Sequence, residues 1–407
     1  MKKTVALILA ACLSLTLFAG CNNSAGGGDV KYLDNYKTTF STSIDTLNPF
    51  VIGGTAVYDF IANTMDSLVE TDNYGRYIPS LAESWETNDD LTVWTFKIRE
   101  GQYFIDYTGQ KTEYEMTAAS WGESLRYAAD PMNDANHISI IRNAIAGLKD
   151  YYWALSDIDD GTDTTTKRED VLKTFDETVG VKAVDKYTLE YTLSGPTPYF
   201  LSLLLLETFV PIAPEFVAEK GEDFGTSAQN LLYSGAYYMS QWDRDKLIVL
   251  NANENYWDKE KVTLKKIQFE KVSDSVSQTE MFQRGEIHAI TLSSEEVAAV
   301  RSGDFGKYIY LSDKGTGTYW FYFFHQSPNP EFRAAVDNEN FRKAIYYALD
   351  RSTLSAIWEP NDPDFFVRNT IQPEDTMFDE DGVDYTDYPA LKPYKENPQF
   401  DATKARE

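Results

Sequence analysis

The chain has 407 residues, 43% of them hydrophobic, and its 64 acidic residues outnumber 37 basic ones, giving a formal net charge of −27. This length predicts roughly two or three domains, because a domain commonly has about 100–200 residues. The apolar and aromatic content excludes a disordered or collagen-like chain, and the negative charge argues against nucleic acid as a partner. Two cysteines and three histidines leave little for a disulfide framework or a zinc site.

The N-terminal stretch has the features of an export signal. Lys2 and Lys3 precede an uncharged and largely apolar run that extends to Gly20. This order of charge, apolar core and small residues is typical of a secretory signal peptide. Cys21 follows, and the polar, glycine-rich stretch 22–28 fits a flexible tether.

The residues before Cys21 are similar to the bacterial lipobox, in which the cysteine is lipidated and becomes the first residue. Cys12 fits the short pattern as well, but cleavage there would leave the apolar stub Leu13–Gly20 exposed. We therefore predict a signal peptide over residues 1–20, lipidation at Cys21 and a tether over residues 21–31.

Alternating hydrophobicity predicts several strands. Apolar residues alternate with polar ones in 91–99 and in 189–193, which predicts two half-buried strands. Residues 246–251 are apolar on both faces, which predicts a central strand. The turn 243–245 joins this strand to 236–242 in a predicted hairpin.

Capping residues followed by apolar stripes predict helices. Thr117 caps a helix that Pro131 ends, and Asn338 caps a second helix further along. The second helix is expected to bury Phe341, Ile345, Ala348 and Leu349. The acidic, threonine-rich stretch 157–170 is predicted to be a surface loop. Strands interspersed with helices favour an α/β or α+β protein of several lobes.

A series of short motifs follows in a fixed order along the body of the chain. The motifs are Ile78–Trp85, Trp94–Arg99, Thr117–Trp121, Gly180–Glu190, Ser234–Tyr237, Asn253–Trp257, Gly285–His288 and Phe341–Arg351. Together they resemble the family 5 solute-binding proteins of ABC importers, above all the lipid-anchored oligopeptide-binding proteins of Gram-positive bacteria. Two positions depart from that pattern, since Ala236 replaces a proline and His288 replaces an acid.

The resemblance implies an α/β, two-lobed periplasmic-binding-protein-like fold (type II, cluster C) with an inserted subdomain. The expected boundaries are 32–75 and 179–270 for lobe I, 76–178 for the inserted subdomain, 271–274 for the first hinge, and 275–407 for lobe II. The hinge follows the edge-like segment 264–270. The resemblance also implies that the second lobe is incomplete, because the helix predicted to begin at Asp401 is followed by much further chain in the family. We therefore expect exposed apolar surface in that lobe, and weak or no ligand binding.

By the same resemblance the protein is a receptor that captures oligopeptides outside the cell and delivers them to the permease subunits of an ABC transporter. It is expected to be a monomer at the extracytoplasmic face of the cell membrane, touching the membrane through its lipid anchor only. We expect no catalysis, no cofactor and no metal. A trap of this kind can bind a peptide backbone as an added strand, so that one protein accepts many sequences.

The predicted ligand contacts of the first lobe lie in the stretch 47–56. Gly53 and Gly54 allow a ligand backbone to approach closely. By resemblance, Gly53 and Thr55 match first-lobe positions that meet the peptide. A plain surface turn is the alternative interpretation.

Further candidates are aromatic residues and a histidine. Residues 319–325 read as an aromatic strand with one face in the core and the other lining the cleft, where Trp320 and Tyr322 would place their polar tips. Alignment with the family adds Phe282 and His137.

Two other functions stay open at the level of sequence. The same fold can bind oligosaccharides or a nickel chelate, since aromatic side chains also stack on sugar rings. A secreted glycosidase is the alternative of another class, and it needs two carboxylates about 5–10 Å apart in one cleft. His137, His288 and His325 lack the spacing of metal ligands, and no catalytic motif is apparent.

Overall fold

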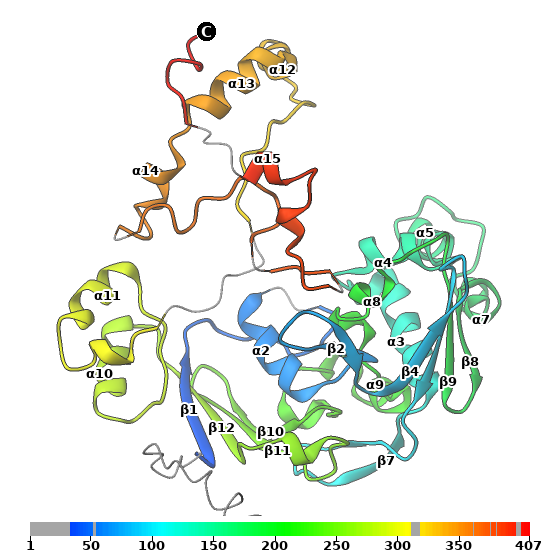
Figure 1. The fold of residues 1–407 in the computed structure, drawn as a ribbon. Helices are drawn as coiled ribbons and strands as arrows, with labels where there is room; N and C mark the ends of the chain where they lie inside the picture. The colour runs from blue at the N-terminus through cyan, green and yellow to red at the C-terminus, as the bar shows by residue number, and fades with distance from the viewer. Residues whose placement is uncertain are drawn as a thin grey trace, which may run out of the picture.

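The structure is a computed structural model that describes residues 33–51, 54–310, 318–360, 362–374, 376–379, 381–395 and 400–407. The predicted signal peptide, Cys21, the tether and Gly53 lie outside the described residues. Figure 1 shows a mixed arrangement of sheets and helices in the first part of the chain, from which the C-terminal segments extend.

The sheet that precedes the expected hinge has four strands. In spatial order they are β1 (Asn35–Phe40), β12 (Lys266–Lys271), β11 (Leu247–Ala252) and β10 (Tyr237–Asp243). The central strand and the hairpin predicted for residues 236–251 are confirmed, with the turn residue Asp245 at a positive φ of 55°.

The edge position expected for residues 264–270 is wrong. β12 lies between β1 and β11, because β1 pairs with it in parallel, with Asn35 opposite Lys266. Hydrophobic alternation did not reveal this partner, since β1 is far away in sequence.

A second four-stranded sheet holds the other predicted strands. Its order is β4 (Ala82–Thr87), β5 (Val93–Ile98), β9 (Thr188–Thr192) and β8 (Val181–Asp185). The strands expected in 91–99 and 189–193 are confirmed, and Trp94, Phe96 and Ile98 are buried as their spacing predicts. The sheet joins strands from both sides of the expected boundary at residue 178. Two hairpins complete the strands: β2 (Val69–Thr71) with β3 (Tyr77–Pro79), and β6 (Tyr103–Ile105) with β7 (Lys111–Glu115).

Helices pack on both sheets. Their bounds are α2 (Thr55–Thr64), α3 (Ala118–Ala129), α4 (Ile138–Ala144), α5 (Leu148–Asp159), α6 (Arg168–Leu172), α7 (Phe175–Thr178), α8 (Phe200–Leu203) and α9 (Pro214–Lys220). The helix predicted after Thr117 is confirmed as α3, and Trp121 on its apolar stripe is buried. On sheet β1-β12-β11-β10, α2 covers the core face, where the rings of Phe60 and Phe269 lie 4.8 Å apart.

The loop predicted for residues 157–170 is shorter than expected. α5 continues to Asp159 and α6 begins at Arg168. Arg168 pairs with Asp159 at 2.9 Å and also with Asp130. In the sequence these charged residues indicate a solvated loop, but in the structure the pair with Asp159 connects α6 to α5.

After β12 the chain enters α10 (Ser275–Gln283), α11 (Ser294–Arg301), α12 (Pro330–Asp337), α13 (Glu339–Ala348), α14 (Arg351–Ser355) and α15 (Lys392–Lys395). Among the described residues of this part, Ile287 and Val336 are the apolar side chains that are fully buried. The exposed apolar surface expected here is therefore confirmed.

Two local expectations in this part are only half right. Asn338 caps α13 by accepting a hydrogen bond from the Asn340 N–H at 2.9 Å, but no residue of α13 is buried, and Phe341 is 37% exposed. Its apolar stripe is only partly covered: α13 packs against α12, and Ile345 is half-buried. At the end of the chain, Asp401 organises a single turn rather than a helix.

No helix in the described residues is both long and apolar enough to cross a bilayer.

Candidate ligand-binding site

The stretch before α2 is held rigidly in the core of the first part of the chain. The Leu47 N–H donates to the Gly225 carbonyl at 2.9 Å, and the Asn48 side chain accepts from the Phe50 N–H at 3.0 Å. Gly225 has a φ of +78°, and a Cβ there would lie 2.3 Å from the Asn48 nitrogen, so glycine is required. The side chains of Leu47 and Phe50 are buried and anchor the stretch in the hydrophobic core.

Beyond this anchor the backbone becomes exposed at Gly54. Gly54 has extended dihedrals, φ −151° and ψ 146°, and occupies the N-cap position of α2. A Cβ built on Gly54 would meet nothing within 4 Å. The fold itself therefore does not require glycine at this position, and the exposed main chain is open to an approaching molecule. Thr55 begins α2, and its side chain is outside the described part.

His137 lies beside this stretch. The Asn136 N–H donates to the Phe50 carbonyl at 2.8 Å, which ties the loop before α4 to the stretch before α2. His137 Nδ1 lies 2.6 Å from Glu207 Oε1, and Glu207 begins a short 3-10 helix, Glu207–Phe209. The structure thus brings one predicted residue, His137, next to the predicted stretch 47–56.

Glu207 and Tyr58 were not predicted from the sequence. Tyr58 is half-buried one turn into α2, and burial, followed by the negative charge of Glu207, raises the pKa of its phenol. The signal for Glu207 was present in the sequence as a single carboxylate between Leu203–Leu206 and Phe209-Val210. A lone acid inside an apolar run is seldom buried without a partner, and a search for such positions would have found it.

The aromatic segment 319–325 differs from its prediction. Residues 318–324 belong to no strand, and both faces are exposed: Tyr319 is 106%, Trp320 66%, Phe321 67% and Tyr322 75% exposed. An alternating pattern forms a strand only where another strand supplies hydrogen bonds, and the described residues supply none here. The core interpretation of one face is therefore wrong, and Trp320 and Tyr322 are free to meet another molecule.

Phe282 lies elsewhere. Its ring on α10 packs against Phe305 with centroids 6.0 Å apart, and Phe305 in turn packs on Tyr308. In Figure 1, α10 and α4 lie on opposite sides of α2.

The other two histidines have local roles. His288 Nδ1 accepts the Lys37 N–H at 2.9 Å and its ring stacks on Tyr36, which adds residues 288–289 to the outer edge of β1. His325 pairs with Asp337 at 2.9 Å. In the part of the chain that the structure describes, no three His, Cys, Asp or Glu side chains are grouped to hold a metal ion.

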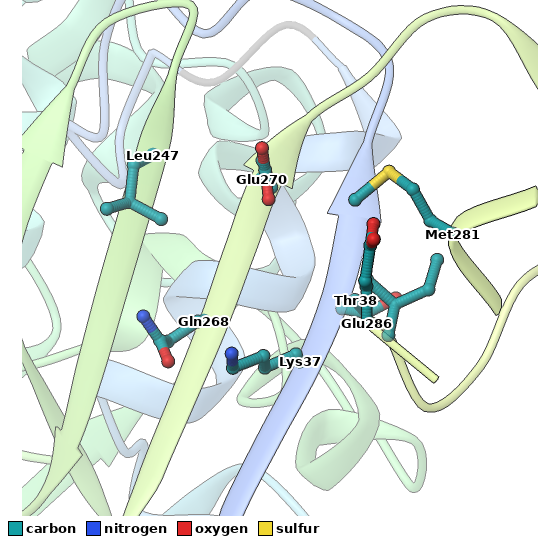
Figure 2. Close-up of a pocket in the computed structure, with 8 residues that line it drawn as sticks. Lys37, Thr38, Leu247, Gln268, Glu270, Met281 and Glu286 are labelled. Carbon is teal, nitrogen blue, oxygen red and sulfur yellow. The ribbon is translucent and has the colours of Figure 1, made fainter. Parts of the chain in front are cut away.

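A hollow of about 300 Å³ lies on the opposite face of the first sheet, beside α10. Figure 2 shows Lys37, Gln268 and Leu247 in front of the strands, with α2 behind them, and Met281 reaching in from α10. The hollow therefore lies on the far side of the sheet from α2 and is separate from Gly54 and His137.

Residues 76–407 match the model of the bacterial extracellular solute-binding proteins, family 5. The chain belongs to this family.

Relatives within the family agree with this assignment. The chain is 31% identical over 372 residues to the oligopeptide-binding protein AmiA of Streptococcus pneumoniae, covering 87% of this chain and 52% of the relative. It is 30% identical over 360 residues to AliB of the same species, covering 84% of this chain and 52% of the relative. The chain thus spans about half the length of these curated relatives.

Among solved structures of the family, OppA of Listeria monocytogenes bound to peptide is similar, with a TM-score of 0.64 and 26% identity. The match covers 92% of this chain and 67% of that one. The periplasmic-binding-protein-like α/β fold expected from the sequence is confirmed by this likeness.

Proposed function

We propose that this family 5 solute-binding protein captures oligopeptides outside the cell and delivers them to the permease of an ABC importer. The observation that carries the proposal is the match, over 84–87% of the chain, to relatives named as oligopeptide-binding proteins. The chain is then a receptor rather than an enzyme, and it releases its ligand unaltered.

The geometry around α2 supports a mechanism for capture. The exposed main chain at Gly54, which follows the anchored stretch 47–50, would offer its N–H to a guest backbone, since its carbonyl already accepts the Val57 N–H at 3.1 Å. Pairing through main-chain groups tolerates many guest sequences. Gly53, Gly54 and Thr55 would contact the guest backbone, and His137 would contact it from the neighbouring loop.

The remaining predicted contacts belong to the C-terminal part. Trp320 and Tyr322 are exposed, and in the proposal they cover guest side chains after the lobes close. Phe282 is a weaker candidate, because its ring is engaged with Phe305. We further propose that Cys21 carries the lipid that anchors a monomeric receptor to the extracytoplasmic face of the membrane, where it meets the permease.

Titration of the purified chain with peptides tests the ligand class. Peptides of three to nine residues and cello-oligosaccharides are added at millimolar concentration, followed by calorimetry and by saturation-transfer NMR, which detects weak binding. We expect saturation transfer and at most weak heat with peptides, in line with the weak binding expected from the sequence, and neither signal with the sugars. Binding of the sugars alone would overturn the proposal in favour of an oligosaccharide receptor.

Gly54→Val tests the proposed contact region. The extended dihedrals of Gly54 suit valine, and the space around it is open, so the fold should be retained. A guest backbone that packs against Gly54 would be blocked, and peptide affinity should fall by at least about tenfold. Gly195→Val is the matched control, because a Cβ at Gly195 also meets nothing within 4 Å. Equal affinities of the two variants would refute this placement of the guest.

A further inference from the structure

One end of the sheet β1-β12-β11-β10 collects lysines. β11 ends at Ala252, and the loop that follows leads to Lys266, the first residue of β12. Because the two strands are antiparallel, with Asn251 opposite Lys266, this loop lies at the end of the sheet where β12 begins. The segment 259–266 has the sequence KEKVTLKK, with four lysines and one acid, in a chain of formal net charge −27.

Three of these lysines have no carboxylate partner in the part of the chain that the structure describes. Lys261 pairs with Asp258 at 2.7 Å. Lys259, Lys265 and Lys266 form no ion pair with a described residue, and the first two are exposed while Lys266 is half-buried. Their ammonium groups are therefore available to an anion outside the protein.

The loop differs in charge from the rest of the molecule. Its other acids are Glu254, Asp258 and Glu260, so the four lysines of residues 253–266 outnumber the acids by one. In the whole chain, by contrast, 64 acidic residues face 37 basic ones. An anionic surface would repel the acidic remainder and would be approached at least cost by this end.

The N-terminal part of the chain joins the body at the same end. The Asp34 carbonyl accepts the Lys265 N–H at 2.7 Å and the Lys266 N–H at 3.1 Å. Residues 1–32 therefore enter the body next to these lysines. A chain that starts at Cys21 reaches at most about 40 Å before it meets the body, so a lipid on Cys21 would keep this end of the sheet close to the membrane.

We propose that Lys259, Lys265 and Lys266 form a docking surface for the anionic headgroups of phospholipids, which orients the anchored receptor on the membrane. The inference rests on the lipid proposed at Cys21 and adds a second membrane contact to it. Three lysines attract an anionic bilayer too weakly to hold an untethered protein. Tethering makes the contact intramolecular and raises the local concentration to the millimolar range, where weak attraction suffices.

This orientation has a consequence for capture. β12 runs from Lys266 to Lys271, and the expected hinge 271–274 follows at its other end. Six residues of strand span about 20 Å. Contact at the lysine end therefore points the hinge end of the sheet away from the bilayer, towards the side from which guests arrive.

Lysine footprinting on vesicles tests the contact. The chain is expressed with its N-terminal signal in a host that lipidates exported proteins, and it is added to preformed vesicles of phosphatidylcholine with or without phosphatidylglycerol. A neutral acetylating reagent is applied briefly, and mass spectrometry gives the reaction rate at each lysine. Lys149 on α5 and Lys182 on β8 are internal controls, because both elements lie on the opposite side of the molecule from β1 and β12 in Figure 1.

We expect Lys259, Lys265 and Lys266 to react at least about threefold more slowly on the phosphatidylglycerol vesicles, and Lys149 and Lys182 to react equally on both. Salt at about 1 M, where the Debye length is about 3 Å, should abolish the difference. Equal rates at the three lysines on both kinds of vesicle would overturn the inference. Equal protection by inorganic phosphate on phosphatidylcholine vesicles would assign the lysines to a soluble anion and would overturn it as well.

Paired substitutions separate this surface from the total charge. Lys265→Gln/Lys266→Gln should remove the protection of Lys259, whereas Lys265→Arg/Lys266→Arg keeps the charge and should keep the protection. Lys149→Gln/Lys182→Gln removes the same charge elsewhere and should leave Lys259 protected. Loss of protection in both glutamine variants would show that only the total charge matters.

Mass spectrometry of the N-terminal peptide distinguishes the two proposals. A chain without lipid on Cys21 would refute the proposed anchor, and the inference would fail with it. A lipidated chain whose three lysines stay unprotected would refute the docking surface alone and leave the anchor in place.

Discussion

Helix caps and apolar periodicity act in the same way in residues 33–271 and in residues 275–407. The two regions differ in how far they bury their apolar side chains. In the first region, one continuous cluster extends from Phe40 to Ile267 and includes residues of both four-stranded sheets. In the second region, the described residues bury only Ile287 and Val336 among their apolar side chains, while Tyr319, Trp320 and Phe321 are more than half exposed.

The difference shows what capping and periodicity accomplish. Thr117 and Asn338 both begin helices where the sequence predicts them, so the local signals act in both regions. Trp121 in α3 is buried, whereas no residue of α13 is. Helix formation is a local event, but stabilisation by apolar burial requires a facing surface.

Limited proteolysis offers the largest expected contrast. With chymotrypsin at low concentration, we expect early cleavage between residues 308 and 395, and a resistant fragment that contains residues 33–271. Cleavage inside the packed region requires opening that approaches the global free energy of unfolding, about 5–15 kcal/mol, whereas exposed segments need little opening. Mass spectrometry of timed samples gives the sites, and equal cleavage rates in both regions would contradict the comparison.

A matched pair of substitutions measures the same contrast in free energy. Phe96 on β5 is fully buried, with its ring 6.1 Å from Tyr191, while Phe321 is 67% exposed. Phe96→Ala should lower the free energy of unfolding by about 3–5 kcal/mol, through lost burial and the cavity that remains. Phe321→Ala should change it by less than about 0.5 kcal/mol. Urea titrations followed by tryptophan fluorescence measure both values, and similar losses would show that Phe321 is packed.

The stability of the packed region should depend on pH because of Asp66. Its carboxylate accepts hydrogen bonds from the Tyr256 hydroxyl at 2.8 Å and from Trp257 Nε1 at 3.2 Å. Burial raises the pKa of this carboxyl, and these hydrogen bonds offset only part of that effect. The folded-state pKa therefore lies above the unfolded value, so the contribution of Asp66 to stability is complete at pH below the unfolded pKa and is lost as pH rises through the folded pKa.

Asp66→Asn removes this titration. Relative to the variant, the unsubstituted protein should become less stable as pH rises from 4 to 7, by less than the effect of Phe96→Ala. Urea unfolding of both proteins at each pH unit measures the difference. A difference that stays constant or changes in the opposite direction would refute the assignment.

The smallest effects are expected from the two helix caps. Thr117→Ala should lower the free energy of unfolding of the packed region by about 1 kcal/mol. Asn338→Ala should leave that transition unchanged, since α13 buries no residue, and should only increase amide hydrogen exchange within α13. Equal shifts of the main transition would mean that both regions unfold as one unit.

Much of the fold was predictable from short-range patterns. The strands β5, β9 and β11 and the helix α3 lie where alternation, capping and proline place them. The resemblance of the short motifs to the family predicted the α/β fold, and the likeness to OppA of Listeria monocytogenes confirms it. Both kinds of signal are contained in a few neighbouring residues.

The candidate site was less predictable. His137 was named by its likeness to the family, but its partner Glu207 lies on a different element and became visible only in the folded chain. Trp320 and Tyr322 were expected in a strand that the structure does not form. A strand needs a neighbouring strand, and a polar pair needs a side chain from a second segment. The local sequence does not show which distant segment supplies either of them.

The sequence by itself determined the positions of β5, β9, β11, α3 and α13, the apolar stripe of α3, and the family to which the motifs are similar. The tertiary structure decided that β12 lies inside its sheet rather than at an edge, because β1 pairs with it from the other end of the region. It also decided that Glu207 meets His137 beside the stretch before α2. Periodicity reports the preference of a segment for burial, whereas the partner that satisfies this preference depends on contacts between residues far apart in the chain.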